Sequence, residues 1–127
     1  MKVKFVFKIL PVFIFYGSKV KGGKTKGMVI RINEKYINDR GLLEHELTHV
    51  KQFYKLPFIN DFLYTLLKSW RYKCELEAYA EQLRWYLIET IDVKIIRFAL
   101  MLSSNYHLNI TAQQVAKDLR ERYETNT

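Results

Sequence analysis

The hydrophobic pattern of the chain changes at residues 39–54, DRGLLEHELTHVKQFY, from the alternation of strands to the spacing of a helix. Asp39 is a suitable N-cap, because its carboxylate can accept a hydrogen bond from a backbone N–H of the first turn. The apolar side chains that follow lie three or four residues apart: Leu43, Leu47, Val50 and Tyr54. We therefore expect a helix that begins after Asp39, turns this stripe toward the core and ends at Pro57.

The residues before this helix have the pattern of strands. Phe5, Phe7 and Ile9 alternate with Lys4, Val6 and Lys8, a second apolar run covers residues 12–16, and residues 28–32 alternate again. Residues 17–27 are rich in glycine and lysine, which predicts a mobile turn or loop. Their segment 18–25, SKVKGGKT, comes close to a phosphate-binding loop, but Ser18 replaces its first glycine and no helix is expected after Thr25. A solvated hairpin is the better interpretation.

Further helices are expected after Pro57, at about residues 58–68, 69–89, 93–102 and 112–123. Asn60 or Asp61 would cap the first of them, and Thr111 the last. The core stripe of the longest one comprises Leu76, Ala80, Leu83 and Leu87. The predicted fold class is α+β: a small N-terminal antiparallel or mixed β-sheet, then the helix after Asp39 and a C-terminal helical part. No linker divides the chain, so a single domain over residues 1–127 is expected.

Composition excludes several classes of protein. With 127 residues, 49% of them hydrophobic, the chain can bury one core and is not expected to be disordered. The single cysteine, Cys74, excludes a disulfide framework and a cysteine-rich zinc ribbon. The apolar run near the N-terminus, residues 9–18, is too short to cross a bilayer, so no membrane partner is expected. Lys8 and Pro11 interrupt the apolar start, which favours a strand over a signal peptide and hence a cytoplasmic location.

The net charge of +8 invites comparison with nucleic-acid-binding proteins. Basic residues are spread along the chain, with one local cluster between Lys19 and Lys26, and no nucleic-acid motif accompanies them. We therefore expect no specific nucleic-acid partner. A basic nucleic-acid-associated protein stays an alternative function.

The segment that carries chemistry is His45-Glu46-x-x-His49, which uses two of the three histidines of the chain. Positions i and i+4 of a helix lie one above the other, so both imidazoles can bind one metal ion. Glu46 is rotated by about 100° from His45 and can reach a water on the metal without binding the metal itself. Because the apolar stripe is expected in the core, both histidines would lie on a flank that opens to a cleft. Two surface histidines on an amphipathic helix are the alternative.

A catalytic zinc needs a third protein ligand and an open position. Gln52 and Lys55 stand where the metzincin extension needs glycine and histidine, which leaves His107, Glu75 and Glu77 as candidates. On a helical wheel Glu77 shares a face with charged side chains, whereas Glu75 falls among tyrosines beside the core stripe. A carboxylate on that semi-apolar face needs a partner, and a metal would supply one. Glu75 is therefore favoured over Glu77.

On these motifs the chain resembles a gluzincin zinc metallopeptidase of minimal size, the group called minigluzincins. The resemblance covers about residues 27–87: the strand at 28–33, HELTH at 45–49 and ELEA at 75–78. It implies that His45, His49 and Glu75 bind Zn²⁺ and that Glu46 is the general base. In gluzincins the third ligand begins a Glu-x-x-x-Asp pattern whose aspartate supports a histidine ligand, and here Tyr79 stands in place of that aspartate.

The expected function is therefore zinc-dependent hydrolysis of peptide bonds, with a peptide or protein as substrate. In similar peptidases an edge strand before the zinc helix pairs with the substrate, which the strand at residues 28–33 would do here. The candidates for a donor that stabilises the transition state are Tyr72, Tyr79, Tyr106, His107 and Arg71. A C-terminal segment over the cleft would make such an enzyme latent. The alternative is a zinc-binding regulatory or scaffold protein of the same fold with weak or no catalysis, because Tyr79 replaces the aspartate.

Overall fold

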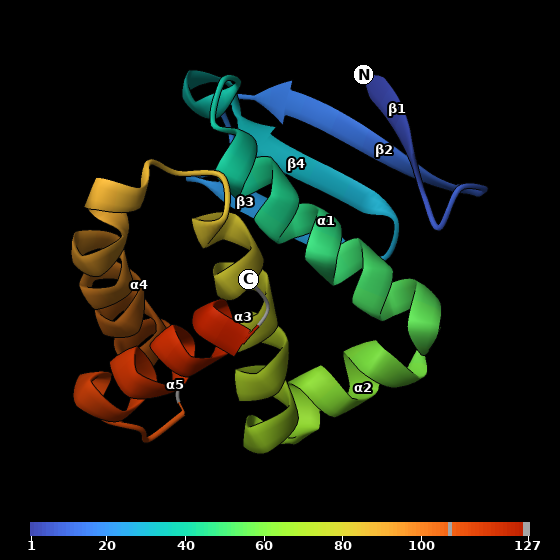
Figure 1. Ribbon diagram of the computed structural model, residues 1–127. Coiled ribbons are helices and arrows are strands. Elements are labelled where there is room, and N and C mark those ends of the chain that lie inside the picture. Colours follow the sequence, from blue (N-terminus) through green and yellow to red (C-terminus); the bar gives the residue numbers. More distant parts are fainter. Residues whose placement is uncertain (107, 126–127) are drawn as a thin grey trace.

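The computed structural model describes residues 1–106 and 108–125 and shows the predicted α+β fold. The described chain begins with a mixed sheet whose strands are β1 (Lys2–Val6), β2 (Leu10–Gly17), β3 (Gly23–Lys26) and β4 (Val29–Asn33). Their order across the sheet is β1-β2-β4-β3. β2 and β4 run parallel, and the two outer strands are antiparallel to their neighbours. The helices follow the sheet in the chain (Figure 1).

Two segments of the sheet differ from the prediction. Residues 7–9 form the turn between β1 and β2 rather than the end of a strand, and Phe7 and Lys8 have positive φ angles of 50° and 72°. Val6 faces the core at 5% exposure, whereas Phe5 is 63% exposed. β3 lies in the stretch predicted as a loop, because pairing with β4 supplies backbone hydrogen bonds that a glycine- and lysine-rich sequence does not indicate.

The sheet edge beside the helices is β3. β4, which contains most of the strand predicted at residues 28–33, has β2 on one side and β3 on the other. Its backbone groups are therefore already paired, and the prediction that this strand is the substrate-pairing edge is wrong. β3 ends the sheet on this side and packs against α1 (Arg40–Lys55).

Besides α1, the described helices are η1 (Glu34–Tyr36), α2 (Ile59–Leu66), α3 (Lys68–Leu83), η2 (Ile88–Thr90), α4 (Ile91–Asn105) and α5 (Ala112–Thr125). Two predicted caps are confirmed: Asp39 Oδ1 accepts from Leu42 N at 2.9 Å, and Thr111 Oγ1 accepts from Gln114 N at 3.1 Å. The cap predicted for α2 is wrong, because Phe58 takes that position without a side-chain hydrogen bond. Within the described ranges, no helix combines the length and apolar composition needed to cross a bilayer.

α3 ends at Leu83 and is shorter than predicted. Tyr86 turns back toward α1, where its hydroxyl donates to Asp39 Oδ1 at 2.9 Å and accepts from Gln82 Nε2 at 2.8 Å. Leu87, predicted in the core, is consequently 69% exposed. The chain thus leaves the helix where the apolar periodicity alone would continue it, and the Tyr86 hydroxyl joins this segment to the start of α1.

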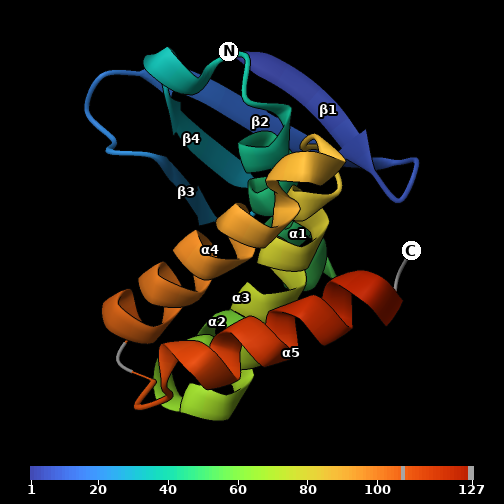
Figure 2. The same ribbon diagram turned by 60° about the vertical axis from the view of Figure 1, so that its left-hand side comes forward.

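The buried apolar side chains form two clusters. The sheet cluster lies between the sheet and α1 and consists of Val6, Val12, Ile14, Ile30, Ile32, Leu43, Leu47 and Val50. The helical cluster lies among α3, α4 and α5 and is centred on Leu83, Ile95, Leu102, Val115 and Leu119. α1 and α3 pack against each other between the two clusters, with α4 and α5 against α3 on the side away from the sheet (Figures 1 and 2). The facing sides of α1 and α3 therefore join the two halves of the molecule.

Candidate metal centre

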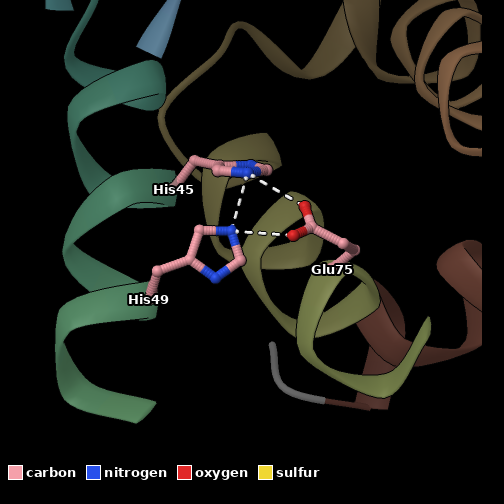
Figure 3. A group of neighbouring side chains, drawn as sticks. All are labelled: His45, His49 and Glu75. Carbon is pink, nitrogen blue, oxygen red and sulfur yellow. Dashed lines mark hydrogen bonds and ion pairs between the residues drawn. The ribbon is translucent and has the colours of Figure 1, made fainter. Parts of the chain in front are cut away.

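The candidate metal centre lies between α1 and α3 (Figure 3). The apolar stripe of α1 packs toward the sheet as predicted, which turns His45 and His49 to the side of the helix that faces α3. Glu75 projects toward them from α3 and is 2% exposed. The structure thus brings together the three residues that the sequence suggested as ligands, and this group could hold a metal ion.

The polar atoms of the three side chains lie at separations that suit a shared metal ion, with one oxygen of Glu75 facing each histidine. His45 Nε2 lies 3.3 Å from His49 Nε2 and 3.4 Å from Glu75 Oε1, and His49 Nε2 lies 3.1 Å from Glu75 Oε2. Bonds of ~2.0–2.1 Å at tetrahedral angles place ligand atoms about 3.3 Å apart. Glu75 Oε1 is buried and, apart from the contact of 3.4 Å with His45 Nε2, has no hydrogen-bond partner among the described residues, which suits an oxygen that binds a cation. The donor set therefore fits a metal ion.

Without metal, Glu75 and His49 form a buried ion pair. Burial by itself lowers the pKa of His49, but the charge of Glu75 and its hydrogen bond outweigh burial and raise the pKa from 6.5 to about 9. Burial likewise favours a higher pKa for Glu75, yet the charge of His49 and hydrogen bonds from both histidines hold that pKa well below its usual 4.5. Near neutral pH the two side chains carry opposite charges, and a metal ion would replace the proton on His49.

Glu46 lies beside the cluster without joining it. Its Oε2 is 3.9 Å from His45 Nε2, and its Oε1 accepts a hydrogen bond of 2.8 Å from the Thr25 hydroxyl on β3. Gly23, also on β3, permits this close approach, because a Cβ at that position would lie 2.8 Å from Glu46 Oε2. The carboxylate predicted to be the general base is thus held between α1 and the edge strand.

A cavity of about 320 Å³ opens over the cluster. Besides the ligand candidates and Glu46, the polar side chains that line it are Lys24, Thr25, Asn60, Asp61, Tyr64 and Tyr106. They come from β3, from α2 and from the residue that follows α4. None of the described residues of α5 lines the cavity, so latency through a C-terminal segment stays a prediction.

Tyr64 is a residue of the site that the sequence analysis missed. Its hydroxyl donates to Glu75 Oε2 at 2.7 Å. Burial, followed by the charge of Glu75, raises its pKa, so the phenol keeps its proton at neutral pH. No motif spacing links Tyr64 to either histidine. It reaches the site only because α2 packs against α3, which is a tertiary contact.

Tyr79 does not take over the role of the aspartate that the resemblance implies at its position, which is to accept a hydrogen bond from a ligand histidine. Its ring packs edge-on against His45, with ring centroids 4.4 Å apart and an angle of 72° between the planes. Its hydroxyl instead lies 3.3 Å from the hydroxyl of Tyr106. Within the described part of the chain, the buried His45 Nδ1 therefore has no hydrogen-bond partner.

The other predicted transition-state donors lie in different places. Tyr72 donates to Asp118 on α5 and packs against the helical cluster. Arg71 donates to three backbone carbonyls, those of Tyr64, Thr65 and Tyr106, and so connects α2 with the residue that follows α4. His107, a candidate both as ligand and as donor, lies outside the described residues. Of the candidates that the structure describes, Tyr106 is the one that lines the cavity.

Gln52 is a second residue that the sequence analysis missed. Its Oε1 lies 2.9 Å from His49 Nδ1, and its Nε2 donates to Glu77 Oε1 at 2.9 Å. Glu77, predicted on a solvated charged face, is therefore part of a network behind the site, and its side chain is 33% exposed. The spacing of three residues between His49 and Gln52, which puts both on one face of a helix, is the signal that could have identified Gln52.

No family model, curated protein or solved structure matches this chain. The function is therefore inferred from the geometry of the site.

Proposed function

We propose that this protein is a zinc-dependent peptidase of the minimal gluzincin type, in which His45, His49 and Glu75 bind zinc and Glu46 is the general base. The observation that carries the proposal is the meeting of a His-His-Glu cluster and a separate carboxylate in one cavity. A site that only stabilised the fold would need ligands but no additional carboxylate beside them. The resemblance in sequence and the geometry point to the same four residues.

The roles of these residues follow from their positions. A bound zinc ion would polarise the scissile carbonyl and lower the pKa of a water in the site. Glu46 would accept the proton of that water and deliver it to the leaving amine. Thr25 supports this role, because its hydroxyl binds Oε1 of Glu46 while Oε2 is directed toward the cluster.

Tyr106 is the best candidate to stabilise the negative charge that develops on the carbonyl oxygen. It lines the cavity, and burial together with the charge of Glu75 raises its pKa, so that it remains a donor at neutral pH. Tyr64 is less suitable, because its hydroxyl already donates to Glu75 Oε2.

The edge strand β3 supports a peptide as the substrate. Gly23, Lys24 and Thr25 line the cavity, so the backbone of β3 runs along its wall. An extended peptide can add to such an edge as a further strand, with main-chain hydrogen bonds that do not depend on its sequence. This pairing would place a scissile bond beside Glu46 and the ligand cluster.

A zinc-binding protein with weak or no catalysis is the second candidate, and one observation favours it. The buried Nδ1 of His45 has no hydrogen-bond partner in the described structure. Tyr79 contacts that imidazole through edge-on packing of the two rings and not through a hydrogen bond. A ligand histidine without such support binds metal less firmly.

Metal stoichiometry on the purified protein tests the centre first. We expect about one zinc per chain, lost in His45→Ala and in Glu75→Gln and kept in Glu81→Gln, a matched carboxylate change on α3 outside the cavity. No zinc on the wild-type chain, even after reconstitution, would contradict the proposal.

Cleavage of a peptide library then separates the two candidates. Glu46→Gln should keep the zinc and lower cleavage by about 10²–10⁴-fold, the usual contribution of a general base. Zinc binding without cleavage by the wild-type chain would favour the second candidate.

A further inference from the structure

A chain of hydrogen bonds runs from the candidate metal centre to the C-terminal helix. It starts at His49 Nδ1, the ring nitrogen that does not face Glu75, which lies 2.9 Å from Gln52 Oε1. Gln52 Nε2 donates to Glu77 Oε1 at 2.9 Å, and Arg122 Nη2 on α5 donates to Glu77 Oε2 at 3.0 Å. The network therefore connects α1, α3 and α5 behind the ligand cluster.

The partners of Gln52 fix the orientation of its amide. Nε2 reaches two groups, the backbone carbonyl of Cys74 at 3.0 Å and the carboxylate of Glu77, and both can only accept. The opposite orientation would place the amide oxygen against these two acceptors. The oxygen therefore faces His49, and because Gln52 is 8% exposed, little water competes for it.

The orientation of Gln52 determines which nitrogen of His49 keeps its proton when a metal ion binds. An amide oxygen only accepts, so Nδ1 of His49 must be the N–H donor of this pair. Nε2 is then the nitrogen left for a metal ion, and it is the atom that lies 3.3 Å from His45 Nε2 and 3.1 Å from Glu75 Oε2. The hydrogen bond also limits rotation of the ring away from the cluster.

We propose that Gln52, anchored by Glu77 and Arg122, is the positioning residue of His49: it holds the proton on Nδ1 and directs Nε2 toward the metal. The inference rests on the metal centre of the proposed function and assigns it a support that the family resemblance does not supply. That resemblance places a carboxylate at position 79. In this chain Tyr79 stands there. The support comes instead from the amide of Gln52 on α1, which contacts His49 and is anchored by Glu77 on α3 and, through Glu77, by Arg122 on α5.

Zinc affinity, measured against a competing chelator, is the first test. Gln52→Leu should weaken zinc binding by about 10–100-fold, the usual effect of losing a partner behind a ligand. Glu81→Gln, on α3 one turn after Glu77 and paired with Arg84, should leave the affinity unchanged. An affinity of Gln52→Leu equal to that of the wild type would overturn the proposal.

Exchanging the amide of Gln52 and the carboxylate of Glu77 distinguishes loss of the network from misfolding of the variant. Gln52→Glu alone places two carboxylates in contact and should weaken zinc binding, because Glu77 is the neighbour of position 52. In the double variant Gln52→Glu/Glu77→Gln, the new carboxylate can accept from His49, and the new amide can donate to it and accept from Arg122. The hydrogen bond to the Cys74 carbonyl is lost in the single and in the double variant alike. A higher affinity in the double variant than in Gln52→Glu is the expected result, and losses that simply add would count against the network.

The ring N–H of His49 gives a readout that needs neither metal nor peptide. In a ¹H–¹⁵N spectrum of metal-free protein at pH 7, the Nδ1–H of His49 should be protected from exchange with water, and Gln52→Leu should remove that protection. A rapidly exchanging Nδ1–H in the wild type would overturn the role of Gln52. A wild type that binds no zinc but shows the protected proton would instead contradict only the proposed function.

Discussion

The placement of Glu46 depends on Gly23, because the missing side chain leaves room for the carboxylate. A methyl group at position 23 would meet the Glu46 carboxylate within 2.8–3.0 Å, whereas one at Gly22 would meet nothing within 4 Å. The carboxylate is the far end of a flexible side chain, so Gly23→Ala should displace it without unfolding the protein. We expect Gly23→Ala to lower kcat/KM for peptide cleavage by up to about 100-fold while zinc affinity is kept. Gly22→Ala is the matched control, and equal activity of the two variants would contradict this account.

The pair of His49 and Glu75 makes the stability of the metal-free protein depend on pH. The pKa of His49 is 6.5 in the unfolded chain and about 9 in the folded one, so its contribution is complete below about pH 6.5 and is lost as the pH rises through about 9. The pKa of Glu75 is lowered, so its contribution is present above about pH 4.5 and is lost as the pH falls further. The free energy of unfolding, measured by urea titration with a chelator, should therefore decrease between pH 6.5 and 9.

Glu75→Gln is the control for this pH dependence. It removes the charge that raises the pKa of His49, so the decrease between pH 6.5 and 9 should shrink or vanish. A wild-type curve that is as flat as that of the variant would show that the pair does not titrate in this way.

At the scale of the element, the end of α3 separates two leucines that the sequence assigns to one core stripe. Leu83 is fully buried, whereas Leu87 is 69% exposed because the helix ends between them. Leu83→Ala should lower the free energy of unfolding by about 2–5 kcal/mol, the usual cost of such a cavity. Leu87→Ala should change it by about 0.5 kcal/mol or less. Similar losses in the two variants, measured by urea titration, would mean that the helix continues as the periodicity suggests.

The elements that sequence could predict are those defined by local pattern. The Asp39 cap, the apolar stripe of α1 and the i, i+4 histidines depend on neighbours within a few residues, and the structure has them as expected. β3 depends on pairing with β4, and its own glycine- and lysine-rich sequence does not indicate that pairing. Tyr64 and Glu77 likewise reach the site through packing between helices, which no spacing in the sequence encodes.

At the scale of the whole molecule, the candidate metal centre connects two separately packed clusters. His45 and His49 belong to α1, which packs on the sheet, and Glu75 belongs to α3, which packs on α4 and α5. Both helices of the pair that joins these halves therefore contribute ligand candidates. A metal ion bound here would therefore cross-link the two halves, and removing it should loosen their contact.

Thermal unfolding in zinc buffers measures this cross-link. A metal that binds only the folded chain stabilises it by about 2.7 kcal/mol when its concentration is 100 times Kd, which for a domain of this size corresponds to a rise in Tm of about 10 °C. The rise should grow with the logarithm of the free zinc concentration. It should be equally large in Glu46→Gln and absent in Glu75→Gln, because of these two glutamates Glu75 is the one in the ligand group. If Glu75→Gln gained as much stability as the wild type, zinc would be binding elsewhere, and α1 and α3 would be held together by their packing alone.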